Sequence, residues 1–240
     1  MIRTAPIAAV TLRSLLDRRR SWLMVGLAAL PVLVMFIATV LGDTTMNERR
    51  FDQLVIRFVL PLVALVFGTG ALGSELDDGT IVYLLTKPIR RFRIVLAKGA
   101  VAAGLTAALL VPATLLTGLL ATAQDDSMAG PTIAYAIAAG IGGTAYALAF
   151  MALSSFTSRA LAIGLAYVFI WEGILSGLFD GTRLFSIRQA TLGLAAEIQG
   201  AEFADTLDGT TSAVMLTLFI VGSLLLASWR LSRYELRGGD

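Results

Sequence analysis

Six long apolar segments alternate with short polar ones along the whole chain. Each has about 20 residues or more, the length an α-helix needs to cross roughly 30 Å of hydrocarbon. A membrane β-barrel needs segments of about 10 residues that alternate in polarity, and these segments are longer and continuously apolar. The pattern predicts an all-α integral membrane protein with six transmembrane helices. The predicted spans are Trp22–Leu41, Val55–Ser74, Gly99–Ala123, Pro131–Phe156, Ala160–Phe179 and Thr210–Trp229.

The amino-terminal segment, residues 1–21, precedes the first span. Its stretch Pro6–Arg20 combines apolar and small residues with the cluster Arg18-Arg19-Arg20. This composition is typical of an interfacial helix whose basic end meets anionic headgroups. A basic segment that only fixes topology would look the same at this level, and both interpretations stay open.

A second helix outside the spans is predicted in the outer segment, residues 180–209. Apolar residues recur there at spacings of three and four, the period of one helical face. We expect a short amphipathic helix at the outer membrane surface. The face consists of Leu184, Ile187, Thr191, Leu194 and Ile198.

The composition excludes a soluble domain. Hydrophobic residues make up 57% of the 240 residues and charged residues 15%, with a mean hydropathy of +0.80. No polar stretch approaches the roughly 50 residues of an independent domain. We therefore predict one transmembrane domain over residues 1–240, divided into 1–21, 22–74 (spans 1 and 2), 75–98, 99–179 (spans 3 to 5), 180–209, and 210–240 (span 6 and tail).

Lys and Arg are distributed unequally between the two sides of the predicted bundle. The side with both termini and the segment 75–98 carries 14 of them, and the other side carries 5. The positive-inside rule then predicts cytoplasmic termini in a plasma (inner) membrane. A small net charge of +2, with basic residues at membrane boundaries, gives no reason to expect a nucleic-acid partner.

The residues that several kinds of catalytic site require are absent from the sequence. The chain has no His and no Cys, so His-based relays, zinc-protease motifs and thiolate metal sites have no ligands. No Gly-x-x-x-x-Gly-Lys-Ser/Thr phosphate loop occurs. We expect no catalytic residue, no metal and no cofactor bound by this chain.

The polar segment between the second and third spans carries the most information. It starts with acidic residues and ends with basic ones, and Pro88 disfavours helical geometry at Lys87. Apolar residues on either side of this point predict two short helices at the cytoplasmic surface. Its distinctive positions are Glu75, Gly79-Thr80, Leu84-Leu85, Pro88, Arg91 and Lys98.

At these positions the chain resembles the ABC-2 family, the type 2 ABC exporter permeases. The family has a Glu at the cytoplasmic end of span 2, then Gly-Thr, Leu-Leu, Pro, an Arg three residues later and a Lys that opens span 3. The resemblance implies that Glu75, Gly79, Thr80, Leu84, Leu85, Pro88, Arg91 and Lys98 belong to a coupling segment. This segment would dock on a separate ATPase subunit, which binds ATP and Mg. It also implies a second permease copy or a paralogue as partner in the lipid bilayer. A non-transporting regulatory, anchoring or immunity component with the same fold is the alternative.

Two charges lie inside the predicted spans, Arg57 and Glu172. A carboxylate in a span is costly in lipid and usually faces a cavity or a partner. Glu172 is predicted near the outer end of its span, where contact with a cationic substrate, pairing with Arg57 or Arg183, or a bond between helices would each explain it. We favour a structural role for this intramembrane polar site.

Small residues recur at four-residue spacing in spans 3 and 4, which lets helices approach closely. We expect these faces to pack within the bundle, with a dimer interface or substrate path as the alternative. They are Ala100, Gly104 and Ala108 in span 3, and Ala136, Gly140 and Thr144 with Ala139, Gly143 and Ala147 in span 4.

Overall fold

The computed structural model describes residues 5–16, 18–41, 53–77, 91–123, 126–176, 180–200 and 206–233. Every regular element within these ranges is helical, as predicted. The elements are α1 (Ala5–Leu15), α2 (Arg18–Val40), the π-helix η1 (Gln53–Val59), α4 (Leu60–Asp77), α6 (Arg91–Thr122), the 3-10 turn η2 (Asp126–Met128), α7 (Ala129–Ser154), α8 (Ala160–Ala166), the π-helix η3 (Tyr167–Leu175), the 3-10 helix η4 (Asp180–Phe185), α10 (Ile187–Gln199) and α11 (Gly209–Ser232).

Within the described ranges, five helices are long and apolar enough to cross a membrane: α2, the continuous η1–α4 helix, α6, α7 and α11. They coincide with five of the six predicted spans. The fifth predicted span is occupied by a shorter apolar helix, Ala160–Leu175. At 1.5 Å per residue it is about 24 Å long, and π-helical geometry shortens it further. The protein is thus a multi-pass helical membrane protein, and its described part supplies five helices long enough to span and a shorter apolar helix at the place of the fifth predicted span.

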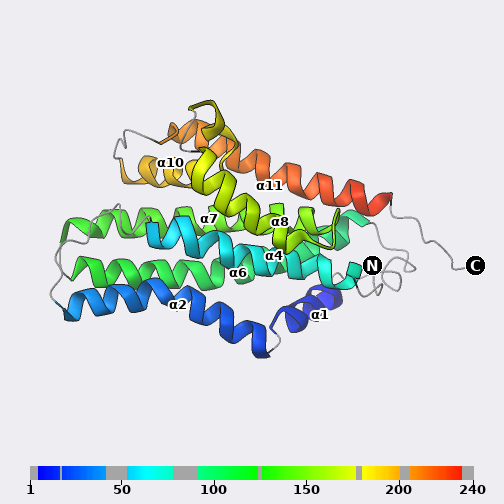
Figure 1. Cartoon of the computed structure of the whole chain (residues 1–240), viewed down its shortest axis with the longest axis horizontal. Coiled ribbons are helices and arrows are strands. Elements are labelled where there is room, and N and C mark those ends of the chain that lie inside the picture. Colours follow the sequence, from blue (N-terminus) through cyan, green and yellow to red (C-terminus); the bar gives the residue numbers. More distant parts are fainter. Residues whose placement is uncertain are drawn as a thin grey trace, which may run out of the picture.

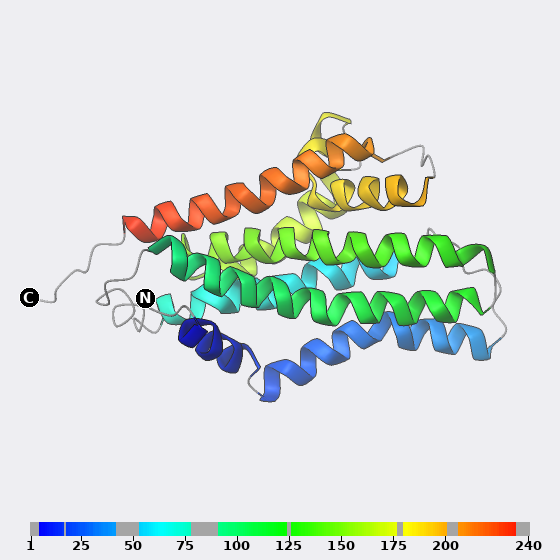
Figure 2. The same ribbon diagram turned by 180° about the vertical axis from the view of Figure 1, so that it is seen from behind.

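The five long helices and α8–η3 alternate in direction along the bundle, and α7 lies in its middle (Figure 1 and Figure 2). It contacts α4, α6, α10 and α11. Its Ala139, Gly143 and Ala147 are buried, and a Cβ at Gly143 would collide with Leu110 of α6. Small residues on α7 therefore provide the close helix approach predicted for this face.

The other small-residue face, on α6, differs from the prediction. Ala100, Gly104 and Ala108 are exposed, and a Cβ at Gly104 would meet no atom within 4 Å. Intramolecular packing was thus the wrong interpretation for this face, because α6 turns larger residues such as Ile94 and Leu110 toward the core.

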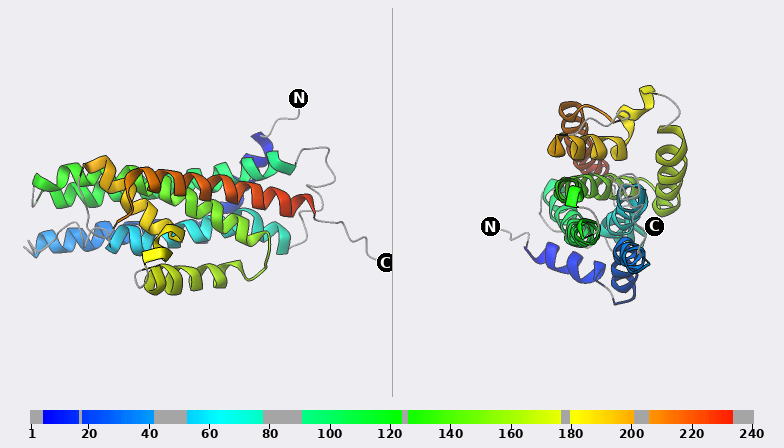
Figure 3. Two further views of the ribbon diagram at one scale, coloured as in Figure 1. Left: turned by 90° about the horizontal axis from the view of Figure 1, so that it is seen from above. Right: turned by 90° about the vertical axis from the view of Figure 1, so that its left-hand side faces the viewer.

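Helix α1 lies across the end of the bundle, as Figure 3 shows. It buries Thr11 and Leu15 against the bundle, whereas Val10 is 62% exposed. This arrangement agrees with an interfacial helix. The helix ends at Leu15, so Arg18–Arg20 begin α2 and do not close the first helix as predicted. The chain must change direction here, from across the bundle to along it.

Helix α6 begins at Arg91, eight residues before the predicted start of span 3. The expected second short helix is therefore wrong over Arg91–Lys98, which forms the first turns of α6. No Gly or Pro interrupts residues 91–98, and Arg, Leu, Ala and Lys are good helix formers. The remainder of the predicted short helices, residues 78–90, lies outside the described residues.

The predicted outer helix is present as α10, beside α7 in the half of the bundle remote from the termini (Figure 1). Its buried face differs from the predicted one. Ile187 and Thr191 are buried as expected, but Leu184 lies in η4 and is exposed, and Ile198 is 42% exposed. Ala190 and Ala195 take part in the packing instead, because α10 lies lengthwise between α7 and α11.

Candidate functional site

The ends of α4 and α6 are joined by a buried lysine at the end of the bundle that carries the termini. Lys98 is only 1% exposed. Its Nζ donates to Oε1 of Glu75 at 2.5 Å and to the carbonyl oxygen of Ala71 at 2.8 Å. The Glu75 side chain is 26% exposed, so the pair sits at the boundary of the core. A buried ammonium needs such partners because the desolvation of an unpaired charge in a low-dielectric interior costs on the order of several kcal/mol.

Arg91 makes a second connection at the same end. Its guanidinium donates to the carbonyl oxygen of Leu231, in the last turn of α11. The carbonyl groups of the last helical turn have no N–H partner within the helix, and a cation near a helix C-terminus interacts favourably with the helix dipole. Arg91 thus links the start of α6 to the end of α11. We call Glu75, Arg91 and Lys98 the clamp.

The clamp contains three of the eight residues predicted to couple to an ATPase. All three make contacts within the bundle, and Lys98 is too buried to meet another chain. The other five, Gly79, Thr80, Leu84, Leu85 and Pro88, lie outside the described residues. The clamp holds α4 and α6, the helices that precede and follow residues 78–90 in the chain.

Glu172 forms a second polar centre, in the other half of the bundle. It is 2% exposed. Its Oε1 accepts hydrogen bonds from the hydroxyls of Tyr146 and Tyr167, each at 2.9 Å, and from the backbone N–H groups of Ile187 at 3.0 Å and Arg188 at 3.4 Å. Its Oε2 accepts from the hydroxyl of Ser186. Both carboxylate oxygens are therefore occupied by the protein itself.

These bonds make Glu172 a cap for α10 that comes from a different helix. The first N–H groups of a helix have no partner within the helix, and its N-terminus favours negative charge. Ser186 is the N-cap residue of α10, and its Oγ also accepts the N–H of Gln189 at 3.0 Å. The carboxylate and the hydroxyl together satisfy this helix end in the protein interior.

Arg57 serves the complementary helix end. Its guanidinium donates to the carbonyl oxygen of Gly173, in the last turn of η3, at 3.1 Å. The Thr182 hydroxyl donates to the carbonyl of Leu175 in the same turn at 3.0 Å. Pairing of Glu172 with Arg57, one of the alternatives left open by the sequence, is not what the structure shows. Arg57 binds a carbonyl at the end of η3, and Glu172 binds donors at the start of α10. We call Arg57, Glu172, Tyr146, Tyr167 and Ser186 the capped junction.

Both charged residues of the capped junction lie in π-helical turns, η1 and η3. The η1 turn precedes Pro61, which has no N–H for the carbonyl of Arg57, so an ordinary helical bond is unavailable there. π-helical turns are frequent at functional sites. Here they bring Arg57 to the end of η3, and each carboxylate oxygen of Glu172 accepts at least one hydrogen bond from the protein.

The sequence did not predict Tyr146 as part of this centre. It is fully buried in α7, 26 residues before Glu172. One local signal was available, because Ser186-x-x-Gln189 has the form of a capping box and marks the start of a helix. The sequence could not predict that Glu172 binds at this helix start, since the contact depends on how α7 and η3 pack.

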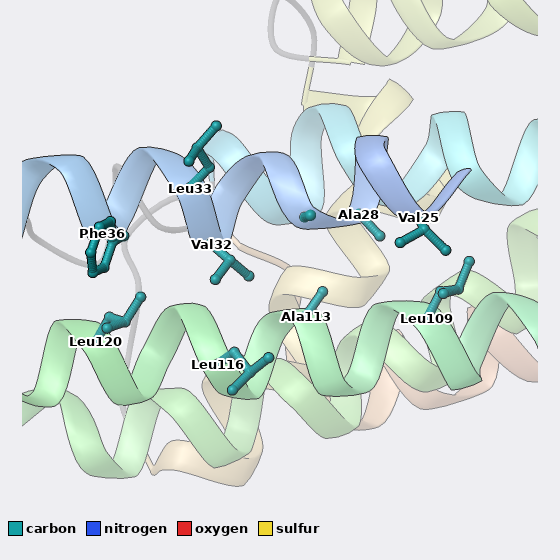
Figure 4. Close-up of a pocket in the computed structure, with 10 residues that line it drawn as sticks. Val25, Ala28, Val32, Leu33, Phe36, Leu109, Ala113, Leu116 and Leu120 are labelled. Carbon is teal, nitrogen blue, oxygen red and sulfur yellow. The ribbon is translucent and has the colours of Figure 1, made fainter. Parts of the chain in front are cut away.

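An apolar groove of about 420 Å³ runs between α2 and α6. Figure 4 shows Phe36 facing Leu120 at one end and Val25 near Leu109 at the other. The ten lining residues that the structure describes are all apolar, and none of them offers a polar side chain to orient a substrate. The remaining lining residues are Ala28, Ala29, Val32, Leu33, Ala113 and Leu116.

Comparison with protein families agrees with this architecture. A family model described as ABC-2 family transporter protein matches residues 16–173, about two thirds of the chain. The chain therefore belongs to the ABC-2 transporter family, and it is a membrane permease component of an ABC transporter. No curated protein matches the chain.

Proposed function

We propose that this chain is the permease subunit of an ABC exporter, with six spans and both termini on the cytoplasmic side of the plasma membrane. It forms the translocation path with a second copy or a paralogue and is driven by a separate ATPase that binds ATP and Mg. Family membership supports this proposal. The observation that carries the coupling part is the clamp, which joins three long helices, two of which flank residues 78–90 in the chain.

The clamp provides a route by which force reaches the spans. Lys98 joins α4 to α6, and Arg91 joins α6 to α11. Movement of segment 78–90 would then displace these three helices together. In this proposal Gly79, Thr80, Leu84, Leu85 and Pro88 form the docking segment, and Glu75, Arg91 and Lys98 hold its base. The main role of the clamp residues is to position the docking segment, and contact with the ATPase is left mainly to that segment.

The coupling proposal is tested by reversing one charge. We expect Arg91→Glu to insert normally but to weaken co-purification with the ATPase or abolish substrate-stimulated ATP hydrolysis. A carboxylate cannot donate to the Leu231 carbonyl and is unfavourable at the C-terminus of α11, so the base of the docking segment would no longer be held. Arg91→Lys keeps the charge and should behave like the wild type. Arg13→Glu, on an exposed position of α1, is the control. If Arg91→Glu binds the ATPase and supports substrate-stimulated ATP hydrolysis like the wild type, Arg91 has no role in coupling.

The orientation is tested by labelling single cysteines in intact cells, which is clean because the chain has no Cys. A cysteine at Ser127, exposed in the turn before α7, should react with an impermeant maleimide. A cysteine at Thr86 should react only after the cells are opened. The opposite pattern would invert the proposed topology.

A further inference from the structure

A second pocket, of about 300 Å³, lies between α2, α4 and the turn that joins α7 to α8. It is formed by residues at the end of the bundle that carries the clamp. Unlike the groove between α2 and α6, it combines apolar and hydroxyl side chains. The lining residues are Leu23, Met24, Val66, Thr69, Gly70, Gly73, Ser154, Thr157, Ser158, Ala160 and Leu161.

The opening of this pocket is on the side of the bundle. Leu23 of α2 and Leu161 of α8 are 68% and 49% exposed, whereas Thr69, Ser154 and Ala160 behind them are buried. Side surfaces of a membrane bundle face lipid. The basic residues Arg18–Arg20 stand just before Leu23, and Arg159 directly precedes Ala160. Basic residues concentrate at the cytoplasmic boundary, so the opening lies near the headgroups of the cytoplasmic leaflet.

The hydroxyl groups define the chemistry that the pocket accepts. Thr69 Oγ1 donates its proton to the carbonyl of Leu65 at 2.7 Å, and Ser154 Oγ donates to the carbonyl of Met151 at 2.8 Å. A hydroxyl has a single proton, so these two oxygens are left with lone pairs and act toward a ligand as acceptors. The Thr157 hydroxyl oxygen, also in the lining, accepts the N–H of Arg159 at 3.1 Å, so its proton is available to a ligand. A complementary ligand must therefore carry a group that both donates and accepts hydrogen bonds, such as a hydroxyl or an amide.

The charge of the lining residues further limits the class of ligand that the pocket can bind. None of the lining residues that the structure describes is charged, and Arg159, between Ser158 and Ala160, is not among them. An ionised head seated among these hydroxyl and apolar side chains would lose hydration without gaining a counter-charge from them, which is strongly unfavourable. A volume of about 300 Å³ is at the small end of ligand pockets, about 300–1,000 Å³, and suits a headgroup with the first part of a chain.

We infer that this pocket binds a neutral amphipathic molecule from the cytoplasmic leaflet, with a hydroxyl or amide head toward Thr69 and Ser154 and an apolar chain leaving between Leu23 and Leu161. This inference rests on the proposed function, for which it names the substrate class. A monoacylglycerol has the required head and chain, and serves as the probe.

The test is photolabelling of the full chain in lipid nanodiscs with a monoacylglycerol that carries a diazirine in its acyl chain. We expect saturable labelling of peptides that contain Leu23 or Leu161. Unlabelled monoacylglycerol should compete, while a fatty acid and an alkylamine of equal chain length should compete at least about tenfold less well, because both heads are charged.

Thr69→Val and Ser154→Ala should each reduce labelling about three- to tenfold, the effect of one lost neutral hydrogen bond. Gly26→Leu is the control, since a Cβ there meets no atom within 4 Å and Gly26 does not line the pocket. Ala160→Leu should block the pocket by volume. Melting curves of all variants establish that each is folded.

Equal labelling of the folded Thr69→Val and Ser154→Ala variants, equal competition by the fatty acid or the amine, or labelling spread over all lipid-facing helices would overturn the inference. The measurement uses the chain without an ATPase. A negative result therefore rejects this site and leaves the permease proposal to the ATPase association experiment.

Discussion

The clamp and the capped junction both place charged side chains inside the bundle, yet they solve different problems. In the clamp, Lys98 and Glu75 join two helices directly, and the Glu75 side chain keeps 26% exposure. In the capped junction, Glu172 is 2% exposed and its partners are hydroxyls and N–H groups at the start of α10. One arrangement joins the last turn of α4 to the first turns of α6, and the other satisfies the end of η3 and the start of α10 inside the bundle.

This difference determines what each region tolerates. A pair of charges can be replaced by two neutral residues with little loss, because the attraction and the desolvation cost disappear together. A carboxylate that satisfies several donors has no such substitute, since each donor stays buried without a partner. The following predictions test that contrast, beginning with the largest effect.

Glu172→Ala should be the most damaging change. It leaves the buried Tyr146 hydroxyl and the Ile187 N–H without their acceptor, at about 1–3 kcal/mol for each unsatisfied group, or about 3 kcal/mol or more in all. The measurement is denaturant unfolding of the purified protein. A cysteine at Thr191, which is 0% exposed, should become reactive to maleimide only with Glu172→Ala.

The matched control is Glu197→Ala, which removes an exposed carboxylate from α10 itself. We expect a change within about 0.5 kcal/mol. Equal loss of stability in the two variants would show that the capped junction does not hold α10.

Lys98→Met should have an intermediate effect. It removes the charge that joins α4 to α6 and leaves Glu75 without this partner, at a cost of about 1–3 kcal/mol, discounted because Glu75 is partly exposed. The double variant Lys98→Met with Glu75→Gln should recover part of this loss. A double-mutant cycle of unfolding free energies measures it, and additive effects would mean that the two residues are not coupled.

Glu172→Gln should have the smallest effect. The amide keeps an oxygen to accept from Tyr146 and Ile187, so only the additional strength of bonds to a charge is lost, about 1 kcal/mol. Substrate-stimulated ATP hydrolysis by the reconstituted complex should stay within about threefold of the wild type. Loss of this stimulation in a stably folded variant would assign Glu172 a role in transport beyond capping.

The sequence by itself determined the class of the protein and the position of its long helices. Continuous apolar runs in a bilayer leave the backbone no alternative to helix, because its N–H and C=O groups must be satisfied within the segment. Local signals also located α1 and α10, and the spacing of Glu75, Arg91 and Lys98 pointed to the family that the comparison confirmed.

Only the tertiary structure decided which polar groups meet. Glu172 contacts Tyr146, 26 residues earlier, and Arg57 reaches Gly173, 116 residues later. Arg91 contacts Leu231, 140 residues later. Such pairs depend on how helices rotate and pack, and helical periodicity predicts which residues share a face but not which helix lies against it. The roles of the buried charges, as links between helices and caps of helix ends, were for that reason decided by the fold.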